Sequence, residues 1–477
     1  MSNLVTRNLL QSLIVVGLVV GLTACGQQQD APPVEAEPAE PAAASLSDAE
    51  IENIVSRSYQ FVAMYNVNNK FAEAQGGYNT ILARTELVDH TMTDIARPNN
   101  DTLYIQVMLD LRQEPMLLRF PAFDSKYVSL MLSGYDHYVS VPMSTRLGDF
   151  AAPETVLFYT ERTKGYSGEP VEGVDQVVEM TGDFLSAIVR VMPHSADPER
   201  FARVVDQIKS VELLSLSGHL GQTRPEDSGF EFPTVGKTDA DIFGTNLFEV
   251  MQFAFNHTTF QPDDPLDVDV LAAWEPLGIV PGGSVADAAV VDYDRDRFRQ
   301  TAAMVAQANL EGLGDAGFVG RVTQYWGQSK GNTTLEGVLA MSVIGPIGLP
   351  LTEASYPTIF TADGSTPNSA NDYVIRMSAE ELPPAEAFWS ITLYDLERGL
   401  FIPNEQYKYS VGENAGFKLN AEGGIEIYIA AEKPEGVPAE NWLPINRDDT
   451  DLSLNLRIYA PDLEQMKTWT TPVAERL

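Results

Sequence analysis

The chain has 477 residues, 44% of them hydrophobic, which is enough for more than one packed core. Its 67 acidic residues outnumber its 31 basic residues, and the resulting formal charge of −36 repels nucleic acid and the anionic faces of membranes. The single cysteine, Cys25, excludes an internal disulfide bond.

The N-terminus reads as a leader for export. Arg7 precedes an apolar stretch over residues 9–22, and the segment Leu22-Thr23-Ala24-Cys25 resembles a bacterial lipobox. We therefore predict a signal peptide over residues 1–24 and a mature protein that begins at Cys25. Acyl chains, palmitate among them, would anchor Cys25 in the lipid bilayer and consume its thiol. The alternative is a free thiol in a transmembrane helix.

The sequence also predicts where the lipoprotein resides. Gly26 follows the acylated cysteine where an aspartate would favour the inner membrane, so we expect the outer membrane, with the folded domains in the periplasm or at the cell surface. Residues 25–46 are rich in proline, alanine and glutamate, a composition typical of an extended linker.

The first folded domain is predicted over residues 47–195. It opens with a capping box, Ser47 with Glu50, followed by a helix to about residue 66. Short segments with strand character then follow one another with proline and glycine between them, a pattern that favours an antiparallel sandwich or jelly roll. These segments are residues 103–110, 116–120, 127–132, 138–141, 155–159 and 185–192. The alternation in the first of them predicts a half-buried strand.

Apolar residues three and four apart predict a helical connecting region over residues 196–344. The expected helices cover residues 198–216, 240–256 and 295–313, with a short helix at 268–274 among loops. Strand periodicity returns in a second domain over residues 345–477, at residues 373–377, 387–394, 424–430 and 452–459. The predicted fold is therefore mainly β with a helical connector, built from two antiparallel jelly-roll-like β-sandwich domains.

Two local signatures make a family resemblance specific. The run Arg97-Pro98-Asn99-Asn100-Asp101-Thr102-Leu103-Tyr104 resembles the opening motif of the bacterial domain of unknown function 1254. The run Phe388-Trp389-Ser390-Ile391-Thr392-Leu393-Tyr394-Asp395, with Arg457-Ile458-Tyr459 further on, resembles its usual companion, domain of unknown function 1214. The resemblance implies two successive β domains and assigns no reaction. The chain departs from the second pattern at Tyr407, Lys408 and Glu413.

The first signature supplies the main candidates for ligand binding. Arg97, Asn99, Asn100, Asp101 and Tyr104 concentrate donors and acceptors just before a strand, where a loop can present them at the rim of a sandwich. Such a set suits sugar hydroxyls or a small polar ligand. The alternative is structural, because Asn and Asp also form turns by bonding their own backbone.

Asp136 and His137 follow a predicted strand and form a carboxylate–histidine pair. With Asp101 they are the candidate catalytic residues, since such a pair can act as a general base. The alternative is a hydrogen-bonded structural histidine. The chain lacks HExxH, GxSxG, P-loop and dinucleotide-binding patterns, so we predict neither a metal nor a cofactor.

Aromatic residues are dense in the second domain, and flat rings on a β surface can stack on sugar faces. Tyr394, Tyr407 and Trp442 are the candidates for such contacts. The alternative is burial: alternation places Trp389 in phase with Ile391 and Leu393, on a core face.

These observations together favour an envelope lipoprotein that binds, and could process, a glycan or another polar envelope ligand. The rival hypotheses are a structural or assembly lipoprotein without catalysis and a hydrolase that uses Asp and His. Whether the protein is an enzyme is left open by the sequence.

Overall fold

A computed structural model describes residues 46–93, 95–139, 143–224, 231–287, 293–325 and 327–477. From Leu46 onward the chain forms one compact unit. The predicted signal peptide, Cys25 and nearly all of the predicted linker lie outside the described residues.

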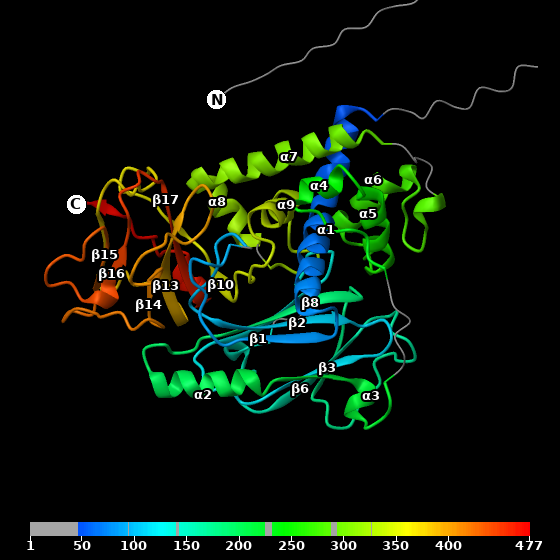
Figure 1. The fold of residues 1–477 in the computed structure, drawn as a ribbon, viewed down its shortest axis with the longest axis horizontal. Coiled ribbons are helices and arrows are strands. Elements are labelled where there is room, and N and C mark those ends of the chain that lie inside the picture. Colours follow the sequence, from blue (N-terminus) through cyan, green and yellow to red (C-terminus); the bar gives the residue numbers. More distant parts are fainter. Residues whose placement is uncertain (1–45, 94, 140–142, 225–230, 288–292, 326) are drawn as a thin grey trace, which may run out of the picture. The chain divides into compact units, whose positions relative to one another are not determined.

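The helices fall mainly in the middle of the chain (Figure 1). They are α1 Asp48–Gln75, α2 Pro198–Lys209, α3 Leu216–His219, α4 Asp239–Phe243, α5 Leu247–Asn256, α6 Pro265–Trp274, α7 Arg295–Glu311, α8 Ala316–Val322, α9 Leu335–Ile344 and α10 Leu463–Met466.

The strands form two groups, one on each side of this helical middle. The first group is β1 Thr80–Arg84, β2 Leu103–Asp110, β3 Met116–Phe120, β4 Val128–Ser133, β5 Met143–Ser144, β6 Glu154–Tyr159, β7 Gln176–Glu179, β8 Phe184–Val191 and β9 Glu212–Ser215. The second is β10 Ala354–Ser355, β11 Thr358–Ile359, β12 Tyr373–Met377, β13 Ala385–Asp395, β14 Ser410–Gly412, β15 Ile425–Ala430, β16 Trp442–Pro444, β17 Leu452–Pro461 and β18 Glu475–Arg476.

The N-terminal strands form two sheets around one core. One sheet has the order β1-β2-β8-β4-β5 and the other β7-β6-β3-β9, with antiparallel pairing throughout except for the parallel pair β6 and β7. Inward side chains such as Ile105, Val107, Leu118 and Val189 fill the space between the sheets. The alternating pattern of β2 arises from this core, because every second residue points into it.

The outer face of the first sheet is also covered, so the prediction of a half-buried strand over residues 103–110 is wrong. On that outer face Gln106 and Met108 are buried, just as Ile105 and Val107 are buried on the core face. Helix α1 packs on part of this face, and the C-terminal domain covers the rest, where Ile188 packs with Phe388 and Tyr459.

Helix α1 is the centre of the helical region (Figure 1). It packs against α4, α5, α6, α7 and α9, and its aromatic and aliphatic side chains form one core with Phe248, Met251 and Trp274. The buried indole N–H of Trp274 donates to Ser58 Oγ at 2.9 Å, which satisfies both polar groups inside this core.

The C-terminal strands also form two sheets around a core. The first contains β10, β17, β13 and β14 in that order, with β11 beside β17, and the second has the order β16-β15-β12-β18. Trp389, Ile391 and Leu393 of β13 and Leu454 and Leu456 of β17 point into the space between them. As the alternation predicted, the other side chains of both strands face away from this core.

The prediction of a mainly β fold with antiparallel sheets and helices between them is confirmed. The predicted helix over residues 198–216 is wrong at its end. Helix α2 ends at Lys209, and Glu212–Ser215 pair with β3 as strand β9 instead. The predicted helix over 240–256 divides into α4 and α5 around Gly244.

The first prediction concerns the start of α1. Ser47 Oγ accepts from the amide of Glu50, while the Glu50 carboxylate accepts from the amide of Ser47 at 2.7 Å. Replacing Ser47 with Ala should therefore lower the free energy of unfolding by about 1 kcal/mol. Urea denaturation followed by circular dichroism measures this change. Ser56→Ala, in the body of the same helix, is the control and should leave stability unchanged or slightly higher; equal effects of the two substitutions would contradict the capping role.

Candidate functional site

The two signature segments of the sequence meet in space. Residues 97–104 lie against the face of β13 and β17 that points away from the C-terminal core. The Tyr394 hydroxyl donates to Pro98 O at 2.6 Å, and Asn99 Nδ2 donates to the Tyr459 hydroxyl at 2.7 Å. We call this contact the seam. It consists of residues 97–104 with Arg190 on the N-terminal side and the outward side chains of β13 and β17 on the other.

Strand alternation explains why the seam is polar. With Ile391 and Leu393 in the core, Ser390, Thr392 and Tyr394 must point the opposite way, and they are buried there. In β17, Ser453, Asn455, Arg457 and Tyr459 alternate with core residues in the same manner. A face that would be a solvated surface in an isolated sandwich is therefore an internal polar layer.

Asp101 and Arg457 are deeply buried charged residues in this layer. Asp101 is 2% exposed and accepts a short hydrogen bond from Ser390 Oγ, and burial raises its pKa. Arg457 is 4% exposed and donates to Thr392 Oγ1, to the Tyr394 hydroxyl and to Arg97 O at 3.3 Å. Burial also raises the pKa of Tyr394, to about 12, so its hydroxyl stays protonated.

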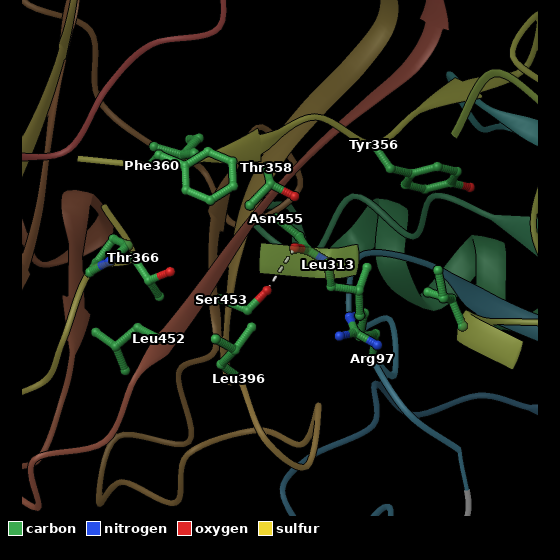
Figure 2. Close-up of a pocket in the computed structure, with 13 residues that line it drawn as sticks. Arg97, Leu313, Tyr356, Thr358, Phe360, Thr366, Leu396, Leu452, Ser453 and Asn455 are labelled. Carbon is green, nitrogen blue, oxygen red and sulfur yellow. Dashed lines mark hydrogen bonds between the residues drawn. The ribbon is translucent and has the colours of Figure 1, made fainter. Parts of the chain in front are cut away.

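A pocket opens beside this layer, and Arg97 lines it (Figure 2). The pocket has a volume of about 50 Å³. Its polar lining comes from Arg97, Tyr356, Thr358, Thr366, Ser453 and Asn455, and its apolar lining includes Leu313, Ile344, Leu396 and Leu452. All three parts of the chain therefore contribute to one pocket: the N-terminal domain, the helical middle and the C-terminal domain.

The Arg97 guanidinium has an unusual electrostatic environment. Burial lowers its pKa and the nearby Arg457 lowers it further, while Tyr394 raises it. Within the described residues no carboxylate lies within 4 Å of this guanidinium. The backbone of Arg97 is held by its own amide, which donates to Gly399 O at 2.7 Å. Its φ of 55° is in the left-handed region.

Arg190 is a third cation in the seam, besides Arg97 and Arg457. It is 4% exposed, donates through Nη2 to Ile347 O at 3.3 Å and lies 5.6 Å from the centre of the Tyr104 ring. Its Nη1 is buried and has no hydrogen-bond partner among the described residues. Tyr104 thus stacks on an arginine rather than reaching open solvent.

The charge of Glu353 is paired with that of Arg146. It pairs with Arg146 Nε at 2.9 Å, accepts from Ser144 Oγ at 2.9 Å and accepts from the Tyr127 hydroxyl at 3.3 Å. This carboxylate is thereby occupied and cannot also balance Arg97 or Arg190.

The structure places Asp136 and His137 away from the seam, under the helical middle. Asp136 is fully buried, accepts from Thr181 Oγ1 at 2.9 Å and lies 3.4 Å from Lys330 Nζ. Lys330 Nζ also contacts Asp267 Oδ2 at 2.5 Å and donates to Thr259 O. The contact with Asp136 attaches the loop that precedes α9 to the N-terminal domain, and the contacts with Asp267 and Thr259 attach it to the rest of the helical middle.

His137 holds the other end of α9. Its Nδ1 lies 2.9 Å from Ser342 Oγ and its Nε2 lies 2.7 Å from Pro346 O. Both ring nitrogens are therefore occupied, and burial lowers the pKa of His137 to about 4. Asp136 and His137 are not brought together with Asp101, so the three candidate catalytic residues do not share a site.

The remaining candidates lie in separate surroundings. Tyr407 is 63% exposed beside the ring of His90, and the half-buried Trp442 donates its indole N–H to Ala430 O at 2.8 Å. Asn100 Oδ1 is buried without a hydrogen-bond partner among the residues described. Only Arg97 of the predicted binding residues lines the pocket.

Sequence reasoning missed Arg190, Tyr356, Ser453 and Asn455. One signal was available for the first of these: Arg190 is the only charged residue in Phe184–Val191, an otherwise apolar or small run in a strand that is buried along its whole length. A cation in such a strand requires a special environment. No comparable signal marks Tyr356.

Two segments of the chain match known family models. Residues 78–212 match the protein of unknown function DUF1254, and residues 353–463 match the protein of unknown function DUF1214. The chain pairs a DUF1254 domain with a DUF1214 domain. The first match covers the N-terminal sandwich and the second covers β10 to β17. The seam is therefore the contact between the two domains. Among curated proteins, none matches the chain.

The fold is shared by a solved structure of another protein. The VPA0106 protein from Vibrio parahaemolyticus is 19% identical, with a TM-score of 0.63 over 90% of this chain and 100% of its own. A putative uncharacterized protein from Burkholderia cenocepacia is 13% identical, with a TM-score of 0.41 over 90% of this chain and 95% of its own. At such identity the first likeness concerns the fold alone.

The described residues show neither a metal-binding cluster nor a membrane-spanning helix. They contain no group of three or more histidine, cysteine, aspartate or glutamate side chains arranged to hold a metal ion. Nor does this part of the chain contain a helix with the length and apolar character needed to cross a bilayer.

The pKa of His137 predicts a pH dependence of stability. Its pKa in the folded protein, about 4, lies below the ordinary histidine value of 6.5, so the unfolded chain binds more protons between pH 4 and 6.5. The contribution of His137 to the free energy of unfolding is therefore fully present above pH 6.5. It falls as the pH drops toward 4, by on the order of 3 kcal/mol. Urea denaturation between pH 4.5 and 7.5 measures it.

A variant isolates the contribution of His137. His137→Gln should lose stability at pH 7 and show a smaller fall on acidification than the parent. His194→Gln should also reduce the fall, because burial lowers the pKa of His194 to about 4 as well, so the two variants are measured side by side. A fall that is unchanged in His137→Gln would show that His137 is not a neutral buried group.

Proposed function

We propose that this protein binds a small polar ligand that carries a carboxylate, with that group against Arg97 in the pocket between the two domains. The ligand is an acidic sugar or another small organic acid of the cell envelope. The protein is held at the envelope by an acylated Cys25 and acts by binding rather than by hydrolysis.

The observation that carries this proposal is the Arg97 guanidinium. It is a poorly solvated cation with a second cation, Arg457, nearby and no carboxylate within ion-pair distance in the described part of the chain. A charge withdrawn from water is costly unless an opposite charge pairs with it. A bound carboxylate supplies that charge, and the planar guanidinium can donate two parallel hydrogen bonds to it.

The pocket limits what can enter. A volume of about 50 Å³ is several times the roughly 10–15 Å³ that one water molecule needs. It accepts a carboxylate and one or two attached carbons but not a whole sugar ring, so a larger ligand would keep its body outside the pocket. Thr358, Ser453 and Asn455 offer hydroxyl and amide groups to the entering part, and Leu396 and Leu452 offer apolar contact.

The burial of the acidic candidates supports binding over hydrolysis. Asp101 and Asp136 are almost inaccessible and are engaged by Ser390 and by Thr181 with Lys330, respectively. A general acid or base must reach the bond that it cleaves, within hydrogen-bond distance or through one water molecule. Neither carboxylate lines the pocket.

The charge of the whole protein does not oppose an anionic ligand at this pocket. The net charge of −36 is spread over the chain, and at physiological ionic strength charges more than about 8 Å apart are largely screened in water. The local excess of guanidinium groups therefore determines the potential that a bound ligand experiences.

Arg97→Met tests the proposal. The parent protein should bind acetate and glucuronate in calorimetric titration, and glucose at least tenfold more weakly. The variant should bind both acids 10- to 100-fold more weakly, since a hydrogen bond to a charged group contributes about 1.5–3 kcal/mol. Without ligand, the variant should be at least as stable as the parent, because the desolvation of a cation and its repulsion from Arg457 are removed.

Arg376→Met is the matched control. Arg376 is an exposed arginine that pairs with Glu426 and Glu475 on the second C-terminal sheet, outside the pocket. Its loss should leave acid binding unchanged. Affinities for acetate and glucuronate that are equal in the parent and in Arg97→Met would contradict the proposed function. A glycan array probed with the parent separates acidic sugars from free organic acids as the ligand source.

Labelling of cells with a fatty-acid probe tests the anchor. The parent should incorporate the label and fractionate with the outer membrane, because several acyl chains on one cysteine hold a protein firmly in a bilayer. Cys25→Ser should incorporate none and should leave the membrane fraction. Equal labelling and fractionation of the two proteins would refute lipidation.

A further inference from the structure

The seam contains more positive than negative charge. Three guanidinium groups, those of Arg97, Arg190 and Arg457, lie in it with one carboxylate, that of Asp101. The adjoining Glu353 is matched by Arg146. Two positive charges are thus unbalanced within the described residues.

Tyr356 lies near both of the unbalanced guanidinium groups. Arg97 lines the pocket together with this tyrosine (Figure 2). Tyr356 also packs on the same cluster as Tyr104 and Ile347, both of which contact Arg190, yet Arg190 itself does not line the pocket. Tyr356 therefore borders both the pocket and the surroundings of Arg190, and we call its side chain the wall of the pocket.

Arg190 has the capacity to bind an anion. Its Nη1 is an unpartnered donor in a residue that is 4% exposed, while Nη2 is fixed by Ile347 O. Such a buried donor leaves a hydrogen bond that the described protein does not complete.

From this arrangement we infer that the ligand is a dianion with two separated anionic groups, a short dicarboxylate. One carboxylate binds Arg97 in the pocket. The second binds Nη1 of Arg190 after the Tyr356 side chain turns to another rotamer and opens the wall. This inference rests on the proposed function, because it assigns the first carboxylate to Arg97.

Dicarboxylates of three to six carbons, each compared with its monomethyl ester, provide the test. The ester has nearly the same size but only one negative charge. Calorimetric titration of the full-length protein should show that at least one dicarboxylate binds ten times more tightly, or better, than its ester. Equal affinities across the whole series would overturn the inference.

Variants at Arg190 separate this inference from the proposed function. Arg190→Met should abolish the advantage of the diacid over its ester and leave the affinity for acetate as in the parent. Arg190→Lys, which keeps the charge, should retain part of the advantage. An advantage that persists fully in Arg190→Met would overturn the inference, whereas loss of acetate binding only in Arg97→Met concerns the proposed function.

Tyr356→Ala provides a second measurement that does not depend on the stability of an Arg190 variant. With the wall shortened, the diacid should bind at least as tightly as to the parent and should still be preferred over its ester. If Tyr356→Ala lost the preference while it kept acetate binding, Tyr356 itself would hold the second carboxylate and the assignment to Arg190 would be wrong.

Discussion

The structure depends on the burial of a polar layer between its two β domains. β13 and β17 must place their aliphatic side chains in the C-terminal core, so their serine, threonine, tyrosine and arginine side chains point outward. These groups need partners, and residues 97–104 supply them through backbone carbonyls, Asn99 and Asp101. Each domain therefore completes the hydrogen bonds of the other, which is why both sandwiches belong to one compact unit.

The strands and their core faces could be predicted because their periodicity is set by local packing. Residues 373–377 are strand β12 as predicted, and Trp389 shares a core face with Ile391 and Leu393 as the alternation predicted. What periodicity cannot show is what covers the second face of a strand. The second side of β2 was predicted to be exposed, yet it is buried, as is the polar side of β17, by segments far away in sequence. The end of the helix predicted over 198–216 failed for a similar reason, since pairing with β3 overrides local helical spacing.

The candidate site was predictable in one respect. The signature from Arg97 to Tyr104 marks the seam, but chemistry could not be assigned to its members without their partners. Asp101 and Tyr104 are occupied by Ser390 and Arg190, whereas Arg97 alone faces the pocket. Asp136 and His137 looked like a catalytic pair because a carboxylate and an imidazole are adjacent in sequence. In the fold they serve opposite ends of α9, one through Lys330 and the other through Ser342.

This role of Asp136 and His137 bears on the pocket, because α9 ends at Ile344, which lines it. The segment that follows carries Pro346 O, bonded to His137, and Ile347 O, bonded to Arg190. The pocket wall and the buried guanidinium are thus held by the same short stretch of chain. A substitution that loosens α9 would alter binding without touching the ligand, whereas one at Arg97 removes a contact. The helical middle thus contributes Leu313 and Ile344 to the lining of the pocket, and the side chain of Tyr356 is the part of that lining that we propose moves to admit a second carboxylate.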